Sequence, residues 1–170
     1  YVLHILMTAN CAWNFWNFRR GLIEALLGDG HRLTLLAPPD ETVINLEGLG
    51  CRFVPLPMSA KGMNPLGELN FMRRLRKIFK AEHADIVLSY TIKNNIFGAM
   101  AARSLNIPFI PNVTGLGSGF LSGGALQAVV ETLYRVAFKS PSQVFFQNND
   151  DEELFVRRNL VDSSKCCILP

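Results

Sequence analysis

Amide, aromatic and cationic side chains crowd a short segment that directly follows the first apolar run of the chain. Residues 8–19 contain the candidate contacts Asn10, Trp13, Asn14, Phe15 and Arg19. Aromatic rings beside amides are suited to stacking on a sugar and bonding its hydroxyl groups, or to forming a partly exposed apolar rim. The segment lacks a G-x-G-x-x-G pattern and therefore does not predict a standard pyrophosphate site. The simpler alternative is that these aromatic rings only pack the following helix.

Two lysines lie where each could meet a phosphate group. Lys61 and Asn64 belong to an expected loop, in which a flexible ammonium can act as a point charge. A solvated loop lysine is the alternative.

The second segment, 90–95, spans the end of an apolar run and the start of a helical one, and its candidates are Tyr90, Thr91, Lys93 and Asn94. With Thr91 as N-cap, free backbone N–H groups favour an anion and Lys93 adds charge, so Lys93→Ala should lower activity and leave the fold intact.

A glycine-rich segment, 112–124, follows the fifth apolar run. Its candidate contacts are Thr114, Gly115, Leu116 and Gly117. Glycines permit a close approach of the backbone to a ligand, but a position after the fifth strand is wrong for a dinucleotide site. We therefore expect a mobile loop that binds an acceptor, with a plain flexible connection as the alternative.

Five cations stand in the eight residues 73–80, interleaved with an apolar helical stripe: Arg73, Arg74, Arg76, Lys77 and Lys80. The default is a helix with a packed stripe and a solvated charged face, and the alternative is docking on an anionic membrane surface.

A net charge of +3 is too small to imply a nucleic-acid partner. The three histidines share no ligand spacing and the four cysteines form no C-x-x-C, so we expect no metal and a reducing cytosol.

The elements that must position these residues alternate regularly along the chain. Strand-like runs cover residues 2–7, 32–37, 51–56, 85–89, 108–113, 143–147 and 166–169, and helical patterns lie between them, with 8–15 expected as a loop. With 170 residues, 49% hydrophobic and 18% charged, the chain can bury one core, and no run approaches the ~18 apolar residues that cross a bilayer. The alternation predicts an α/β fold with a doubly wound, parallel sheet of about seven strands and helices on both faces. Ligands bind such sheets at the carboxyl ends of the strands.

Five motifs in order resemble the N-terminal half of GT-B glycosyltransferases of the retaining group 4 type. They are N-F-R (17–19), K-G-M-N-P (61–65), Y-T-I-K-N-N-I-F-G (90–98), N-V-T-G-L-G (112–117) and F-F-Q-N-N-D-D (145–151). The resemblance is strongest to the branch that extends lipid-linked intermediates of bacterial surface polysaccharides such as lipopolysaccharide or capsule. It implies that residues 1–170 form one Rossmann-like domain that binds a lipid-linked or saccharide acceptor.

The same resemblance implies a C-terminal domain, absent from this chain, that binds the nucleotide-sugar donor and carries an E-x(7)-E pair. The full-length protein would transfer a hexosyl or N-acetylhexosaminyl group without a cofactor, in the cytoplasm, with peripheral contact to the inner membrane. Many members place a histidine after the fifth strand. Here that loop reads Thr114-Gly115-Leu116-Gly117, so no catalytic residue is assigned.

Three other functions fit the pattern less well. A nucleotide-sugar epimerase would share the half-fold but need no acceptor, and a stand-alone module would bind a sugar or a protein partner without catalysis. A dehydrogenase is the weakest alternative, because the first turn has no glycine fingerprint and the second strand ends in Ala37-Pro38-Pro39 without a ribose-binding acid.

Overall fold

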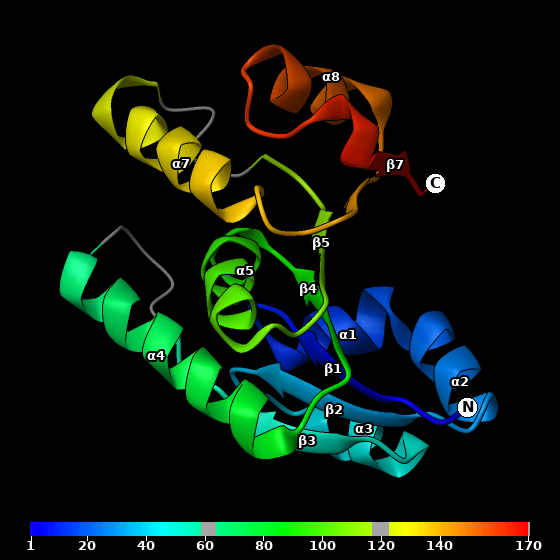
Figure 1. The fold of residues 1–170 in the computed structure, drawn as a ribbon. Helices are drawn as coiled ribbons and strands as arrows, with labels where there is room; N and C mark the ends of the chain where they lie inside the picture. Colours follow the sequence, from blue (N-terminus) through cyan, green and yellow to red (C-terminus); the bar gives the residue numbers. More distant parts are fainter. Residues whose placement is uncertain (59–63, 117–122, 170) are drawn as a thin grey trace.

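A single seven-stranded parallel sheet forms the centre of the molecule in the computed structural model, which describes residues 1–58, 64–116 and 123–169 (Figure 1). Its strands are β1 (His4–Thr8), β2 (Arg32–Ala37), β3 (Arg52–Pro55), β4 (Ile86–Tyr90), β5 (Phe109–Val113), β6 (Val144–Phe146) and β7 (Cys166–Ile168). They lie in the order β3-β2-β1-β4-β5-β6-β7. The predicted doubly wound parallel sheet is confirmed, and its direction of winding reverses between β1 and β4.

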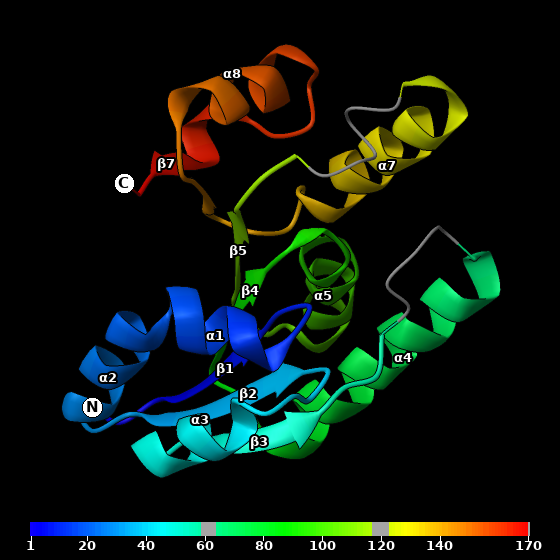
Figure 2. The same cartoon turned by 180° about the vertical axis from the view of Figure 1, so that it is seen from behind.

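Helices cover both faces of this sheet (Figures 1 and 2). They are α1 (Ala12–Phe18), α2 (Arg20–Gly28), α3 (Val43–Leu49), α4 (Pro65–Glu82), α5 (Ile92–Leu105), α7 (Gly124–Ala137) and α8 (Asn149–Arg157), with a short 3₁₀ turn at Ser163–Lys165. One apolar core packs α1, α2 and α3 against the sheet, and a second core packs α4, α5, α7 and α8 against the other face. Because both faces are covered, the strands are mostly apolar rather than alternating.

The first helix was missed by the sequence pattern, which predicts a loop over residues 8–15. The structure forms α1 there, because Ala12 and Phe15 are buried in the core and the Trp13 N–H donates to the carboxylate of Asp40 at 2.8 Å. That bond satisfies one of the backbone donors that a helix start leaves unpaired. Phe18, the last residue of α1, is 59% exposed and meets Trp13 edge to face.

Local signals do fix the starts of two long helices. The side chain of Asn64 accepts a hydrogen bond from the Leu66 N–H, and Pro65 occupies the first helical position of α4, where proline is favoured. The side chain of Asn148 caps α8, whose first turn carries Asp150, Asp151 and Glu152. Acidic residues stabilise a helix start because they face the positive end of its dipole.

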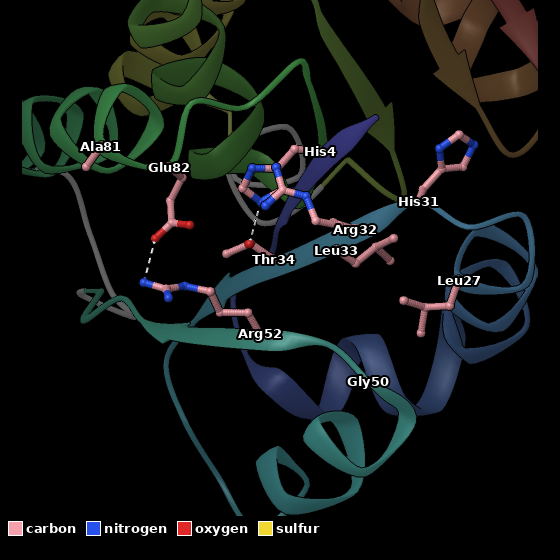
Figure 3. A pocket seen from close by; sticks show the side chains of 10 residues that line it. All are labelled: His4, Leu27, His31, Arg32, Leu33, Thr34, Gly50, Arg52, Ala81 and Glu82. Carbon is pink, nitrogen blue, oxygen red and sulfur yellow. Dashed lines mark hydrogen bonds and ion pairs between the residues drawn. The ribbon is translucent and has the colours of Figure 1, made fainter. Parts of the chain in front are cut away.

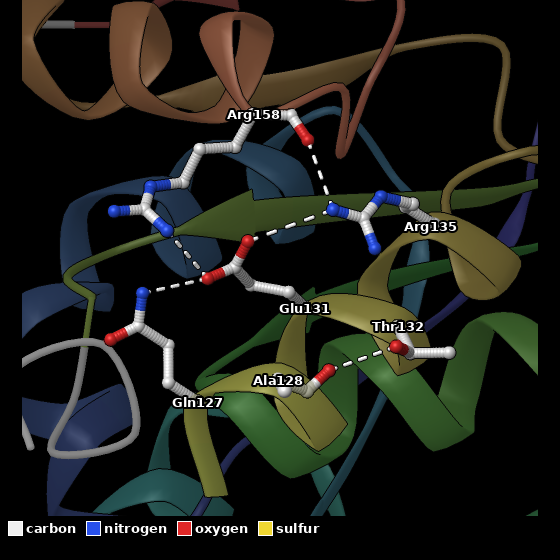
Figure 4. A network of polar contacts seen from close by, with 6 residues as sticks. All are labelled: Gln127, Ala128, Glu131, Thr132, Arg135 and Arg158. Carbon is white, nitrogen blue, oxygen red and sulfur yellow. Dashed lines mark hydrogen bonds and ion pairs between the residues drawn. The ribbon is translucent and has the colours of Figure 1, made fainter. Parts of the chain in front are cut away.

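A buried polar network joins α7 to the end of α8 (Figure 4). Glu131 is buried, and its carboxylate accepts from Gln127 at 2.7 Å and from the Arg158 guanidinium at 2.8 Å. Arg135 lies 3.7 Å from the same carboxylate and also donates to the Arg158 carbonyl. The network fixes the orientation of α7, which matters because α7 forms one wall of a surface groove described below.

Gly98 in α5 lies against the ring of Phe109, so we expect that Gly98→Ala destabilises the protein. A Cβ at this position would lie 2.8 Å from the ring of Phe109, which is itself buried. The overpacking should cost about 1–3 kcal/mol. Thermal or urea unfolding measures it, and Gly48→Ala is the control, since a Cβ there meets nothing within 4 Å. Equal stability of the two variants would contradict the close packing of α5 on β5.

Candidate active site at the carboxyl edge of the sheet

The side chain of Asn94 connects the carboxyl ends of β1 and β4 by hydrogen bonds, at the point where the direction of winding of the sheet reverses. Asn94 is fully buried at the start of α5, and its amide donates to the Thr8 hydroxyl at 2.5 Å and to the Ala9 carbonyl at 3.3 Å. The Thr91 hydroxyl donates in turn to the side-chain oxygen Oδ1 of Asn94 at 3.1 Å. The ends of β1 and β4 are thus held together at the edge where doubly wound sheets bind ligands.

Arg19 and Tyr90 meet at the same edge. The guanidinium of Arg19 lies 4.4 Å from the centroid of the Tyr90 ring, and Tyr90 is buried. Burial raises the pKa of Tyr90 to about 12, even though the positive charge of Arg19 opposes the shift. The phenol therefore stays neutral at physiological pH, and because it is buried its role is to pack beneath Arg19 and not to contact a ligand directly.

The segment after β1 offers both polar and apolar groups to this edge. Asn10 and Trp13 are exposed. The Asn14 side-chain oxygen and the Arg19 Nε are buried and have no hydrogen-bond partner among the described residues. Phe15, in contrast, is fully buried in the core below α1, so its role is packing and not direct contact with a ligand.

Lys93 lies at the same edge but is paired, which the sequence did not reveal. Its ammonium contacts the carboxylate of Glu68 at 2.6 Å, and the two side chains are only 17% and 8% exposed. One sequence signal does point to Glu68, since it shares the helical spacing of the buried stripe of α4 with Phe71, Leu75 and Phe79. Lys93→Ala would leave a buried, unpaired carboxylate, so the expectation of an intact fold needs correction.

A hollow of about 140 Å³ opens beside this ion pair. It is lined by Pro57, Met58, Asn64, Gly67, Glu68, Phe71, Arg74 and Lys93. Two cations against one carboxylate give the lining a net positive charge, which suits a phosphate group. The side chain of Asn64, proposed from the sequence as a ligand contact, is occupied in capping α4.

Thr91 holds a conformation that L residues rarely adopt. Its φ of 75° and ψ of 158° lie in a region used almost only by glycine, and its hydroxyl does not cap the helix that begins at Ile92. The predicted cap position is thus correct, but the predicted side-chain cap is wrong, because the hydroxyl is directed to Asn94 instead. Strained backbone of this kind gathers at functional sites.

The glycine-rich segment continues from β5, next to β4 in the sheet. Thr114 and Leu116 are half-buried and Gly115 is exposed, and Leu116 packs on the core under α4 and α5. Two further candidates, Lys61 and Gly117, lie outside the described residues.

The five cations of α4 are all exposed but do not form one surface. Arg73, Arg76, Lys77 and Lys80 line one shallow hollow along the helix together with His83. Arg74 lies apart from them, donates to the Pro57 carbonyl at 3.1 Å, and lines the hollow of Lys93. We call the first four residues the cationic stripe.

Asp40 anchors the site from the end of β2, and its ionisation should be visible in the stability of the protein. Burial alone raises the pKa of Asp40, but hydrogen bonds from the Thr42 hydroxyl, the Thr42 N–H and the Trp13 N–H outweigh it and lower the pKa below its ordinary value. The stabilisation is therefore complete above the ordinary pKa and is lost as pH falls through the lower, folded-state pKa.

We expect Asp40→Asn to lose about 1–2 kcal/mol of unfolding free energy at neutral pH, and the difference from the parent protein to shrink below about pH 4. Unfolding titrations across this pH range measure it. Asp29→Asn, at an exposed position after α2, is the control. A pH-independent difference would contradict the role assigned to the carboxylate.

A second polar hollow lies at the opposite, amino edge of the sheet (Figure 3). His4, Arg32 and Arg52 begin β1, β2 and β3 there, and Glu82 ends α4. Two of its polar contacts are internal: His4 contacts the Thr34 hydroxyl at 2.7 Å, and Arg52 pairs with Glu82 at 2.9 Å. It lies at the strand ends far from the switch point, so the carboxyl edge remains the candidate site.

The described part of the chain contains neither a cluster of metal ligands nor a membrane-spanning helix. Within 1–58, 64–116 and 123–169, no three His, Cys, Asp or Glu side chains come together as a metal site. No described helix is both long and apolar enough to span a membrane.

Known proteins with similar sequences act on lipid-linked sugars. The chain is 29% identical over 161 residues to the N,N'-diacetylbacillosaminyl-diphospho-undecaprenol alpha-1,3-N-acetylgalactosaminyltransferase of Campylobacter jejuni, covering 92% of the chain and 43% of that protein. It is 24% identical over 119 residues to an Escherichia coli UDP-Gal:alpha-D-GlcNAc-diphosphoundecaprenol alpha-1,3-galactosyltransferase, covering 68% of the chain and 30% of that protein. The chain thus spans less than half the length of either relative.

Solved structures show the same fold. A glycosyltransferase from Rickettsia africae superimposes with a TM-score of 0.70 at 19% identity, over 98% of this chain and 42% of that one. The UDP-GlcNAc 2-epimerase of Methanocaldococcus jannaschii reaches a TM-score of 0.65 at 15% identity, over 99% of this chain and 45% of that one. Fold alone therefore does not separate transferases from epimerases. Residues 16–170 match the glycosyl transferase 4-like domain, and the chain belongs to that family.

Proposed function

We propose that this chain is the acceptor-side domain of a retaining glycosyltransferase. The complete protein would move a hexosyl or N-acetylhexosaminyl group from a nucleotide-sugar to a lipid-linked diphosphate acceptor, with a C-terminal domain holding the donor. The observation that carries the proposal is the hollow at the carboxyl edge, where Arg74 and Lys93 are placed together beside the switch point. Both curated relatives are named for substrates in which a sugar is joined to diphospho-undecaprenol.

The residues of this domain would bind and orient the acceptor. Guanidinium and ammonium groups bind phosphate oxygens strongly, and Glu68 holds the Lys93 ammonium in a fixed position. Exposed Trp13 and half-buried Arg19 lie at the same edge and would offer a ring face and a guanidinium group to the sugar. Positioning of this kind lowers the barrier because a bound acceptor hydroxyl no longer has to find the donor by diffusion.

The cationic stripe would hold the enzyme at an anionic membrane. Each lysine or arginine near such a surface contributes about 1 kcal/mol. Four such residues on one side of α4 favour a peripheral position at the cytoplasmic face of the inner membrane, where lipopolysaccharide or capsule intermediates would be extended.

Product analysis with the complete protein tests the proposal and separates it from the epimerase alternative. Nucleotide-sugars are incubated with and without a synthetic diphosphate-linked sugar acceptor, and the products are followed by mass spectrometry and by NMR of the anomeric carbon. We expect a new glycosidic bond, with the anomeric configuration of the donor, only when acceptor is present. Conversion of the nucleotide-sugar without acceptor would indicate an epimerase, and no turnover in either case would favour a binding module.

A further inference from the structure

An apolar groove of about 520 Å³ runs between α4, α5 and α7. Its floor is formed by Phe97 and Met100 of α5, and its walls by Leu69 and Met72 of α4 and by Leu126 and Val129 of α7. Figures 1 and 2 both show α5 lying between the other two helices. Leu69, Leu126 and Val129 remain 37%, 39% and 48% exposed, so the groove presents unpaired apolar surface to the outside.

The groove shares a wall with the proposed acceptor site. Glu68 lines both the apolar groove and the hollow that contains Arg74 and Lys93. A ligand with a charged head in the hollow could therefore extend an apolar tail directly into the groove. The size of the groove falls within the ~300–1,000 Å³ of typical small-molecule sites.

The surroundings indicate where the far end of such a ligand would go. Along α4, exposed Leu66 and Leu69 give way to the cationic stripe at Arg73, Arg76, Lys77 and Lys80, on the same side of the helix at spacings of three, four and seven residues. An apolar opening flanked by cations matches the chemistry of a lipid leaflet with anionic headgroups. A tail leaving the groove would enter that leaflet.

We infer that the apolar groove binds the first isoprenoid units of the lipid acceptor, so that the domain recognises the tail as well as the diphosphate. The inference rests on the proposed function. It commits the groove to one occupant, a polyisoprenoid chain, rather than to a second protein or to the membrane surface itself.

Tail recognition is tested with the complete protein in buffer that contains neither lipid nor detergent. Two acceptors are compared that share the same diphosphate-linked sugar but carry a prenyl or a geranylgeranyl tail, at concentrations where both remain monomeric. We expect the KM of the geranylgeranyl acceptor to be lower by about tenfold or more, because the longer tail removes more apolar surface from water. In the double variant Leu126→Asn/Val129→Asn this ratio should fall to about twofold or less, because the KM of the geranylgeranyl acceptor rises much more than that of the prenyl acceptor.

The matched control is Ile44→Asn, which removes an apolar side chain that is 78% exposed on α3, on the other face of the sheet. It should leave the tail preference intact, and thermal unfolding should show that all variants fold. An equal KM for both acceptors, or a preference that survives in the double variant, would overturn the inference alone. If the double variant lost binding to anionic vesicles but kept its preference for the longer tail, the groove would contact the membrane surface instead, and the inference would also be overturned. Absence of transfer to either acceptor would refute the proposed function and the inference with it.

Discussion

Lys93→Met should destabilise the domain by about 3–5 kcal/mol and abolish most transfer activity. The substitution removes the ammonium that lies 2.6 Å from the Glu68 carboxylate and leaves that charge buried without its partner. Breaking one side of a buried ion pair is costly, because the remaining charge has lost its water as well as its counter-ion. Urea unfolding of the variant gives the stability change, and Lys139→Met at an exposed position is the control.

The double variant Lys93→Met/Glu68→Leu separates structure from function. Replacing both charges by apolar groups of similar size should restore stability to within about 1 kcal/mol of the parent protein. It should not restore transfer, because the hollow has lost a phosphate-binding cation. Recovery of transfer in the double variant would show that Lys93 has only a structural role, and a double variant as unstable as the single one would contradict the ion-pair energetics.

Asn94→Ala should cost about 2–4 kcal/mol, since it strands several buried polar groups at once. The Asn94 side chain forms hydrogen bonds with Thr8, Ala9 and Thr91, and its loss leaves the buried Thr8 hydroxyl and Ala9 carbonyl without these bonds. The change also loosens β1 from α5 at the switch point, so transfer should fall more than stability alone explains. To separate the two effects, transfer is measured well below the unfolding temperature of the variant, where nearly all of the protein is folded.

Asn70→Ala is the matched control, because Asn70 is exposed on α4 and away from the strand ends. It should leave both unfolding free energy and transfer within error of the parent protein. If Asn94→Ala behaved like Asn70→Ala, the hydrogen bonds of Asn94 would not be what holds the ends of β1 and β4 together.

The sheet was predictable because its strands are marked by signals close together in the sequence. Each expected strand lies within two or three residues of the observed one, since buried parallel strands are continuous apolar runs with turn residues on either side. The starts of α4 and α8 were equally local, because a capping asparagine precedes each of them by one residue. Such features depend on a few neighbours, which a single sequence displays.

The errors arise where distant residues decide the local structure. Helix α1 depends on the bond between Trp13 and Asp40, which are 27 residues apart, and Lys93 is paired with Glu68, 25 residues away. The burial of Phe15 and the separation of Arg74 from the cationic stripe likewise follow from packing between elements. Periodicity reports which face of an element is apolar, but not which residue of another element will meet it.

The claim that the carboxyl-edge hollow holds the diphosphate of the acceptor is tested most directly by Arg74→Gln in the complete protein. Arg74 is exposed, so its replacement should leave the fold unchanged, and Lys80→Gln in the cationic stripe is the control. We predict that the KM for a water-soluble diphosphate-linked acceptor rises about tenfold in Arg74→Gln while the KM for the nucleotide-sugar stays constant. A rise in the KM for the nucleotide-sugar instead, or no change in either constant, would contradict the assignment of this edge to the acceptor.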